Sequence, residues 1–259
     1  MQSLNRVVRR GAHDQHRIEV PFVGLQRLNF GFAYGQLAMI AAGPGVGMSA
    51  LALQLALDGG LPTLYISADT DSWTMTVRAL AHLTGHQQTY ITQCLEGGAA
   101  KAELALAMED GAHGQFSFDS YTTADVLDDV KAYAVVHGDW PRLIIIDNLL
   151  NLARGGDDDL SSQTKAMDEL HALAAMTGAC VLVLHHATGQ FDDGDKPIPL
   201  SGLANKLSKL PAQILTLYKR DSDVFLCVTK NRQGRADPSG KLQVRTHFDG
   251  ERMIFRDGS

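Results

Sequence analysis

The residues with the clearest capacity for chemistry form a glycine-rich turn, AGPGVGMSA, at residues 42–50. An apolar run, Leu37–Ala42, precedes the turn, and helical spacing follows over Ser49–Leu57. A glycine turn between a strand and a helix lets backbone N–H groups approach phosphate oxygens, and the helix dipole favours the anion. The residues predicted to bind nucleotide phosphates are Gly43, Gly45, Gly47, Met48 and Ser49.

This turn departs from the usual phosphate-loop pattern G-x-x-x-x-G-K-[ST]. Met48 stands at the lysine position and Ala42 at the first glycine, whereas Ser49 keeps the hydroxyl that holds Mg²⁺. A lysine on a phosphate is a charge-assisted contact worth about 1.5–3 kcal/mol, or roughly 10–100-fold in affinity. We therefore expect weak binding of ATP with Mg²⁺ or Mn²⁺, and a larger loss of turnover. A turn that binds no ligand is the alternative.

Acidic residues follow two apolar runs that are typical of buried strands. Asp147 ends the run Leu143–Ile146, and at the sheet edge beside the glycine turn it would hold Mg²⁺ together with Ser49. Asp69 follows the run Thr63–Ser67 and could orient an attacking water. Its alternative role is a helix cap, and Asp71 competes for both roles.

Apolar runs alternate with segments of helical spacing along most of the chain. This alternation predicts an α/β fold with a mostly parallel central sheet and helices on both faces. The expected strands are 37–42, 63–67, 116–118, 142–147 and 180–184, and the expected helices are 49–57, 72–83, 123–136 and 162–176. Four later strand-like runs, at 213–218, 224–229, 242–246 and 253–255, predict an antiparallel C-terminal extension.

The first 20 residues differ from the rest, because they carry several arginines and little apolar periodicity. We expect a basic arm over residues 1–20, either disordered or in contact with a neighbouring subunit or phosphate. Residues 21–259 then form one core domain. The 259-residue chain has a formal net charge of −6, so any nucleic-acid contact must be local or aided by cations. Its apolar runs are too short for a membrane span, and its three spaced cysteines fit a reducing cytoplasm.

From about Val23 to Phe255, the order of these motifs resembles the RecA superfamily, and specifically the motor domain of DnaB-like replicative helicases. The segments that carry the resemblance are Gly24–Leu28, Ala42–Ser49, Ser67–Asp69, Ile146–Leu149, Leu184–His186, Pro199–Leu203, Thr229–Gly234 and Phe248–Gly250. The resemblance implies a RecA-like P-loop NTPase fold. It also implies a ring, usually of six subunits, with ATP between neighbours and single-stranded DNA in the channel.

The resemblance also assigns roles to individual residues. Asp69 stands in place of the family's catalytic glutamate, which is one methylene longer, and Asp147 is the magnesium-binding acid. His186 stands where the family places a polar sensor of the γ-phosphate. Lys230 and Arg232 would reach the nucleotide of the neighbouring subunit; the alternative is two solvated basic residues in a turn.

Two segments that would face the channel are acidic, Arg154–Asp159 and Phe191–Lys196. Loops that hold single strands are usually basic or aromatic. Either basic residues bind the DNA, or divalent cations bridge carboxylates to phosphates, or the loops are simply solvated. The basic candidates are Arg154, Lys196, Lys206 and Lys209. The acidic candidates for a nuclease metal site are Asp69, Asp147, Asp157, Asp158, Asp192 and Asp193.

The expected function is that of a RecA/DnaB-like ring that binds nucleotide and single-stranded or forked DNA in replication or recombination. Helicase-like activity with weakened ATP turnover is the leading expectation, in the cytoplasm of a bacterium or a phage-infected host. One alternative is a metal-dependent, structure-specific DNA nuclease on the same fold. Another is a ring or loader that binds DNA without hydrolysing ATP.

Overall fold

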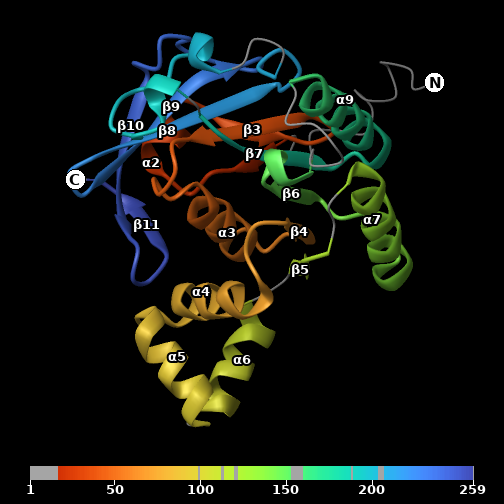
Figure 1. Ribbon diagram of the computed structural model, residues 1–259, viewed down its shortest axis with the longest axis vertical. Helices are drawn as coiled ribbons and strands as arrows, with labels where there is room; N and C mark the ends of the chain where they lie inside the picture. Colours follow the sequence, from red (N-terminus) through yellow and green to blue (C-terminus); the bar gives the residue numbers. More distant parts are fainter. Residues whose placement is uncertain are drawn as a thin grey trace.

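A nine-stranded sheet forms the centre of the part of the chain that the structure describes (Figure 1). The computed structural model describes residues 17–98, 100–111, 114–119, 122–152, 160–187, 189–203 and 207–258. From one edge to the other, the strands are β11 (Ile254–Asp257), β10 (Gln243–Asp249), β9 (Asp223–Asn231), β8 (Gln213–Arg220), β3 (Leu37–Ala42), β7 (Cys180–His186), β6 (Leu143–Asp147), β4 (Thr63–Ser67) and β5 (Gly114–Ser117).

The strands from β8 to β5 run parallel to one another, and β9, β10 and β11 continue the sheet antiparallel from β8. All residues of β3 and β6 are buried. Burial on both faces explains why these strands read as continuous apolar runs. The predicted α/β fold, with its parallel centre and antiparallel C-terminal extension, is confirmed.

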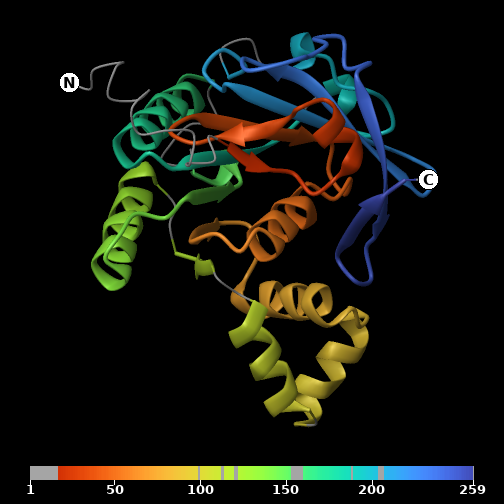
Figure 2. The same cartoon turned by 180° about the vertical axis from the view of Figure 1, so that it is seen from behind.

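Helices cover both faces of the sheet, and β3 contributes alternate side chains to each side. Ala38 and Ile40 pack in the cluster that contains α3 (Met48–Asp58), whereas Leu37 and Met39 pack in the opposite cluster. Three helices supply residues to that opposite cluster: α7 (Thr123–His137), α8 (Leu149–Leu152) and α9 (Leu160–Thr177). In Figures 1 and 2, α7 and α9 lie on the same side of the molecule.

Three helices project from this body as a separate unit, at the lower end in Figures 1 and 2. They are α4 (Ser72–Thr84), α5 (Gln88–Gly97) and α6 (Lys101–Gly111). The α4–α6 unit has its own small core, which includes Val77, Leu80, Ile91 and Leu104. We predicted α4 but neither α5 nor α6.

The start of the described chain forms a small antiparallel sheet, in which β1 (Arg17–Glu19) pairs with β2 (Gly31–Ala33). The last residues of the predicted arm therefore pair within their own chain. Its arginines at positions 6, 9 and 10 lie outside the described residues. The short helix α2 (Val23–Arg27) follows β1. Among the described residues, no helix has the length and apolar character needed to cross a bilayer.

Gln54 joins the helix after the phosphate loop to the far edge of the sheet. It is 6% exposed, its Nε2 donates to the carbonyl of Phe255 at 3.2 Å, and its Oε1 accepts from the Phe255 N–H at 2.7 Å. These bonds hold β11 against α3, and they satisfy backbone groups that water does not reach.

We expect Gln54→Leu to lower the free energy of unfolding by about 1–3 kcal/mol, because it leaves buried polar groups of Phe255 without partners. Denaturant unfolding followed by circular dichroism measures this change. The control is the same substitution at Gln93, which is exposed on α5 and should change stability by less than about 0.5 kcal/mol. Equal losses in the two variants would contradict this account.

Candidate functional site

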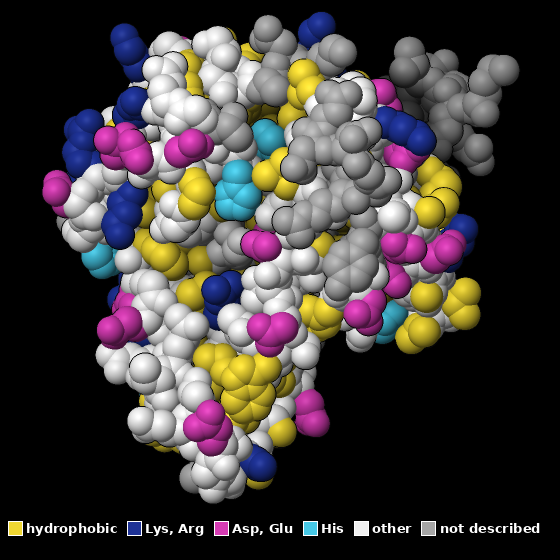
Figure 3. Space-filling view, in the orientation of Figure 1, with side chains coloured by type: hydrophobic (Ala, Val, Ile, Leu, Met, Phe, Trp, Pro, Cys, Tyr) yellow, Lys and Arg dark blue, Asp and Glu magenta, His cyan; other side chains and the backbone are white. Residues whose placement is uncertain are grey.

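The carboxyl ends of the parallel strands meet at one edge of the sheet, where the sequence predicted a site. Ala42 of β3 is opposite His186 of β7, and Ser67 of β4 is opposite Asp147 of β6. A cavity of about 580 Å³ opens there, a volume suited to a small ligand. In Figure 3, histidine, acidic and basic side chains lie near one another in the middle of this face, between the sheet and the α4–α6 unit.

The glycine-rich turn lines this cavity and leads directly into α3. Gly45 and Gly47 have φ angles of +73° and +105°, which disfavour any residue with a side chain. A Cβ on Gly47 would also lie 3.0 Å from Phe255 and 3.1 Å from Phe248. Space around Gly45 is open, so a ligand can approach the backbone there. The predicted strand, glycine turn and helix are confirmed as structure.

The segment after β7 packs directly on the glycine turn. A Cβ on Gly43 would lie 2.7 Å from the carbonyl oxygen of Asp192, and a Cβ on Gly194 would lie 2.4 Å from Val46. Glycine at both positions therefore permits this close contact. The side chains of Asp192 and Asp193 are exposed, so the acidic part of this segment faces solvent.

Met48 provides no positive charge at the phosphate loop. Its side chain is 4% exposed and packs in the core cluster that contains α3. Backbone N–H groups and the N-terminus of α3 are therefore the electropositive features that the loop itself offers to a phosphate.

Asp147 is the most deeply buried acid of the site, with 2% of its surface exposed. The Tyr65 hydroxyl donates to its Oδ2 at 2.7 Å. Burial raises the pKa of Asp147, although Tyr65, the nearby Ser49 hydroxyl and His186 favour its ionised form; the nearby Asp69 raises the pKa further. Ser49 and Asp147 thus lie together, as a shared Mg²⁺ site requires.

The structure separates the roles of Asp69 and Asp71. Asp71 is the N-cap of α4, because its carboxylate accepts from the N–H and hydroxyl of Thr74. Asp69 lines the cavity, and Asn151 Nδ2 donates to its Oδ1 at 3.0 Å. Asp69 is therefore oriented toward the ligand space by a neighbour from α8.

The two histidines at the end of β7 differ in position. His186 lines the cavity. His185 is 6% exposed and does not line the cavity, and burial lowers its pKa to about 4. His185 is therefore a neutral residue of the interior, and His186 is the histidine available to a ligand.

Lys230 and Arg232 lie away from this cavity, on β9 and the turn after it. Lys230 Nζ donates to the carbonyls of Ser208 and Lys209 at 2.7 and 2.8 Å, and Arg232 donates to the Lys209 carbonyl at 3.0 Å. Burial, together with the charge of Arg232, lowers the pKa of Lys230 to about 8. These contacts fix both cations in place, outside the cavity of their own chain.

The predicted DNA and nuclease residues are only partly described. Arg154, Lys206, Asp157 and Asp158 lie outside the described residues. Among those described, Lys209 is exposed, and Lys196 Nζ lies 5.6 Å from the centre of the Phe191 ring. No group of three or more histidine, cysteine or acidic side chains in the described ranges could hold a metal ion. Asp69 and Asp147 lie near each other at the sheet edge, whereas the side chains of Asp192 and Asp193 are exposed.

Arg78 of α4 and Gln88 of α5 are among the cavity residues that were missing from the sequence prediction. Gln88 belongs to none of the predicted motifs, but its Nε2 donates to the Gly250 carbonyl at 2.8 Å and its N–H donates to the Glu251 carbonyl at 2.9 Å. It thus holds the β10–β11 turn at the rim of the cavity. One sequence feature could have pointed to Arg78: no other lysine or arginine occurs between Arg27 and Lys101.

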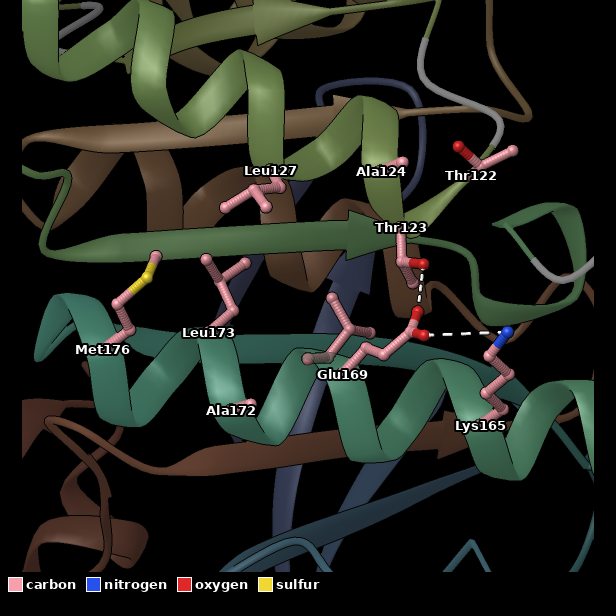
Figure 4. Close-up of a pocket in the computed structure, with 10 residues that line it drawn as sticks. Thr122, Thr123, Ala124, Leu127, Lys165, Glu169, Ala172, Leu173 and Met176 are labelled. Carbon is pink, nitrogen blue, oxygen red and sulfur yellow. Dashed lines mark hydrogen bonds and ion pairs between the residues drawn. The ribbon is translucent and has the colours of Figure 1, made fainter.

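A second cavity, of about 630 Å³, lies between α7 and α9 and has different chemistry (Figure 4). Its walls include Leu127, Leu173 and Met176. The carboxylate of Glu169 accepts from the Thr123 hydroxyl and lies 3.9 Å from Lys165 Nζ. Apolar walls and internally paired charges make this groove unsuited to a phosphate.

Comparison with known proteins shows the family of this chain. Residues 29–190 match the profile of a family described as AAA domain. The chain belongs to the AAA domain family. It is 37% identical over 233 residues to the Gene 65 protein of Mycobacterium phage L5, covering 86% of each chain. It is 35% identical over 231 residues to the Gene 65 protein of Mycobacterium phage D29, covering 85% of this chain and 99% of that one.

Solved structures place this AAA domain in the RecA-like fold. One of them, an isolated ATPase domain, superposes with a TM-score of 0.79 at 20% identity, over 99% of this chain and 97% of that one. A DnaB-like replicative helicase, described with its primase interactions, superposes with a TM-score of 0.82 at 17% identity, over 98% and 67%. The predicted resemblance to DnaB-like motor domains is confirmed, and the phage relatives fit it.

Asp147→Asn should raise the free energy of unfolding at neutral pH. The pKa of Asp147 is raised on folding, so its favourable contribution is complete below the unfolded value of about 3.9 and is lost as pH rises through the folded pKa. Asparagine carries no charge to bury, and its side-chain oxygen can still accept from the Tyr65 hydroxyl. The gain over the parent should therefore shrink on acidification to about pH 4, in denaturant unfolding at several pH values. A pH-independent loss of stability would contradict the raised pKa.

Proposed function

We propose that this AAA domain binds a nucleoside triphosphate with Mg²⁺ at the loop Gly43–Ser49 and acts as a ring on DNA during replication. The observation that carries the proposal is the cavity itself, in which Ser49 lies at the end of the glycine turn, close to the buried Asp147. A hydroxyl and a carboxylate are ligands suited to Mg²⁺. The open space at Gly45 and the N-terminus of α3 suit a phosphate. The residues present thus fit a magnesium nucleotide, apart from the absent lysine.

Each site residue has a role in this proposal. Ser49 and Asp147 hold the cation, which when bound neutralises phosphate charge. Asp69, held by Asn151, accepts a hydrogen bond from the attacking water and orients it. His186 lies at the cavity wall, where its ring can donate to a phosphate oxygen. Tyr65 keeps its proton, because burial raises its pKa, and so it remains a donor to Asp147.

Two observations support the ring and the DNA contact. Lys230 and Arg232 are held by backbone carbonyls outside the cavity of their own chain, and in a ring they would serve a neighbour's nucleotide. Similar folds occur in a DnaB-like replicative helicase and in a second solved ATPase domain. We propose single-stranded or forked DNA as the partner, a hexameric ring as the assembly, and the cytoplasm of a phage-infected bacterium as the location.

A non-hydrolysing ring is the second candidate, and the burial of Met48 favours it. An apolar side chain at the lysine position removes a contact that stabilises charge on the transferred phosphoryl group. Binding would then survive through backbone donors, while turnover would fall. No observation on the described residues favours the nuclease alternative.

Met48→Lys should tighten binding of Mg²⁺–ATP by roughly 10–100-fold, because it restores a charge-assisted contact. It should also raise ATP turnover. Fluorescent-nucleotide titration and phosphate release measure the two effects. The control is Met48→Leu, which keeps an apolar side chain and should leave affinity unchanged. If the lysine changes neither quantity, the loop is not a phosphate site.

We expect a ring-forming oligomer in which Arg232 serves the adjacent subunit. In the Met48→Lys background, Asp69→Asn and Arg232→Gln should each abolish ATP turnover, and mixing the two proteins should restore part of it. Mixed rings contain interfaces with an intact Asp69 on one side and an intact Arg232 on the other. Light scattering with nucleotide and DNA supplies the assembly mass. Monomers at micromolar concentration, or no recovery in mixed rings, would count against the shared site.

A further inference from the structure

The candidate site lacks the positive charge that the lysine of a phosphate loop usually provides. Two carboxylates, Asp69 and Asp147, lie at the sheet edge where a triphosphate would bind, and the loop offers Met48 instead of a lysine. Like charges in a partly buried cavity repel strongly. The absent lysine thus leaves the phosphates without a cation from the loop of their own chain, and another element can provide it.

Arg78 is the only lysine or arginine among the described residues that line this cavity. It is partly buried, and its Nη1 lies 3.5 Å from Thr70 Oγ1, at the outer limit of a hydrogen bond. No ion pair found within the described ranges involves Arg78. Its guanidinium therefore keeps most of its donors for a ligand.

The helix α4 fixes Arg78 at this position. Met75 and Ala79 on the same helix pack into the core cluster of α3, three residues before and one residue after Arg78. One turn further on, His82 Nε2 contacts Asp58 Oδ1 at 2.7 Å, and His82 Nδ1 contacts the Met253 carbonyl at 3.0 Å. Since this face of α4 is anchored at both ends, Arg78 is held beside the cavity.

The charge of Arg78 also reaches the magnesium end of the site. It acts on Tyr65, whose pKa it lowers against the larger effect of burial, and Tyr65 donates to Asp147. Arg78 thus lines the cavity that the glycine turn lines and lies close enough to Tyr65 for its charge to act there.

We propose that Arg78 supplies in cis the positive charge that the phosphate loop lacks, by binding the phosphates of the nucleoside triphosphate. This inference rests on the proposed function. A guanidinium presents paired N–H donors that match two phosphate oxygens, and it stays charged at any physiological pH. An arginine on α4 can therefore take over the electrostatic role of a lysine that Met48 has displaced.

The test is a double-mutant cycle on the affinity for fluorescent ATP with Mg²⁺. Arg78→Gln should weaken binding roughly 10–100-fold in the parent. In the Met48→Lys background, the same substitution should weaken binding far less, because the lysine already meets the phosphates. Arg220→Gln is the matched control: Arg220 is exposed at the end of β8 and does not line the cavity. It removes the same charge and should leave affinity unchanged.

The outcomes separate this inference from the proposed function. If the parent binds nucleotide and Arg78→Gln does not weaken that binding, or weakens it equally in both backgrounds, then Arg78 does not take over the role of the loop lysine. Nucleotide binding at the loop would still stand. If neither the parent nor Met48→Lys binds nucleotide, the proposed function fails, and this inference fails with it. Thermal unfolding of each variant must match the parent, and Arg78→Lys should recover part of the affinity as a retained cation.

Discussion

The burial of one carboxylate, that of Asp147, constrains the rest of the site. A buried charge is costly unless it is hydrogen-bonded and compensated. Its partners come from separate elements: Tyr65 from β4, Ser49 from α3 and His186 from β7. A slip of β6 by one residue would turn Asp147 to the other face and leave all three without it. The register Ser67↔Asp147 is therefore a requirement of the chemistry as well as of the sheet.

The parts that could be predicted from the sequence are those that local pattern determines. Runs such as Leu37–Ala42 and Leu143–Asp147 read as strands because both of their faces are buried. Clustered glycines between an apolar run and a helical segment predict a tight turn between a strand and a helix. Parallel strands then bring their carboxyl ends to one edge of the sheet. The expected helix at 123–136 also begins as a local pattern dictates, because Thr122 forms a capping box with Asp125 at the start of α7.

The remaining parts depend on contacts between distant segments, which periodicity does not encode. Gln54 forms hydrogen bonds with Phe255, 201 residues later in the chain. Gln88 donates to the carbonyl of Gly250, 162 residues later. The helix α6 has little apolar periodicity, and α5 buries only Ile91 and Cys94, within the α4–α6 unit. The choice between Asp69 and Asp71 required their hydrogen bonds: one caps α4, and the other receives Asn151.

A cation on α4 has a different mechanical consequence from one on the phosphate loop. A loop lysine moves with the loop alone, whereas Arg78 moves with a helix that is joined to two other elements. His82 ties α4 to α3 at Asp58 and to the β10–β11 turn at Met253. Both ring nitrogens of His82 contact oxygens, and these partners raise its pKa above the ordinary value despite its burial. Phosphate contact through Arg78 would therefore be sensitive to the position of the α4–α6 unit, and a bound triphosphate would in turn hold that unit against the sheet.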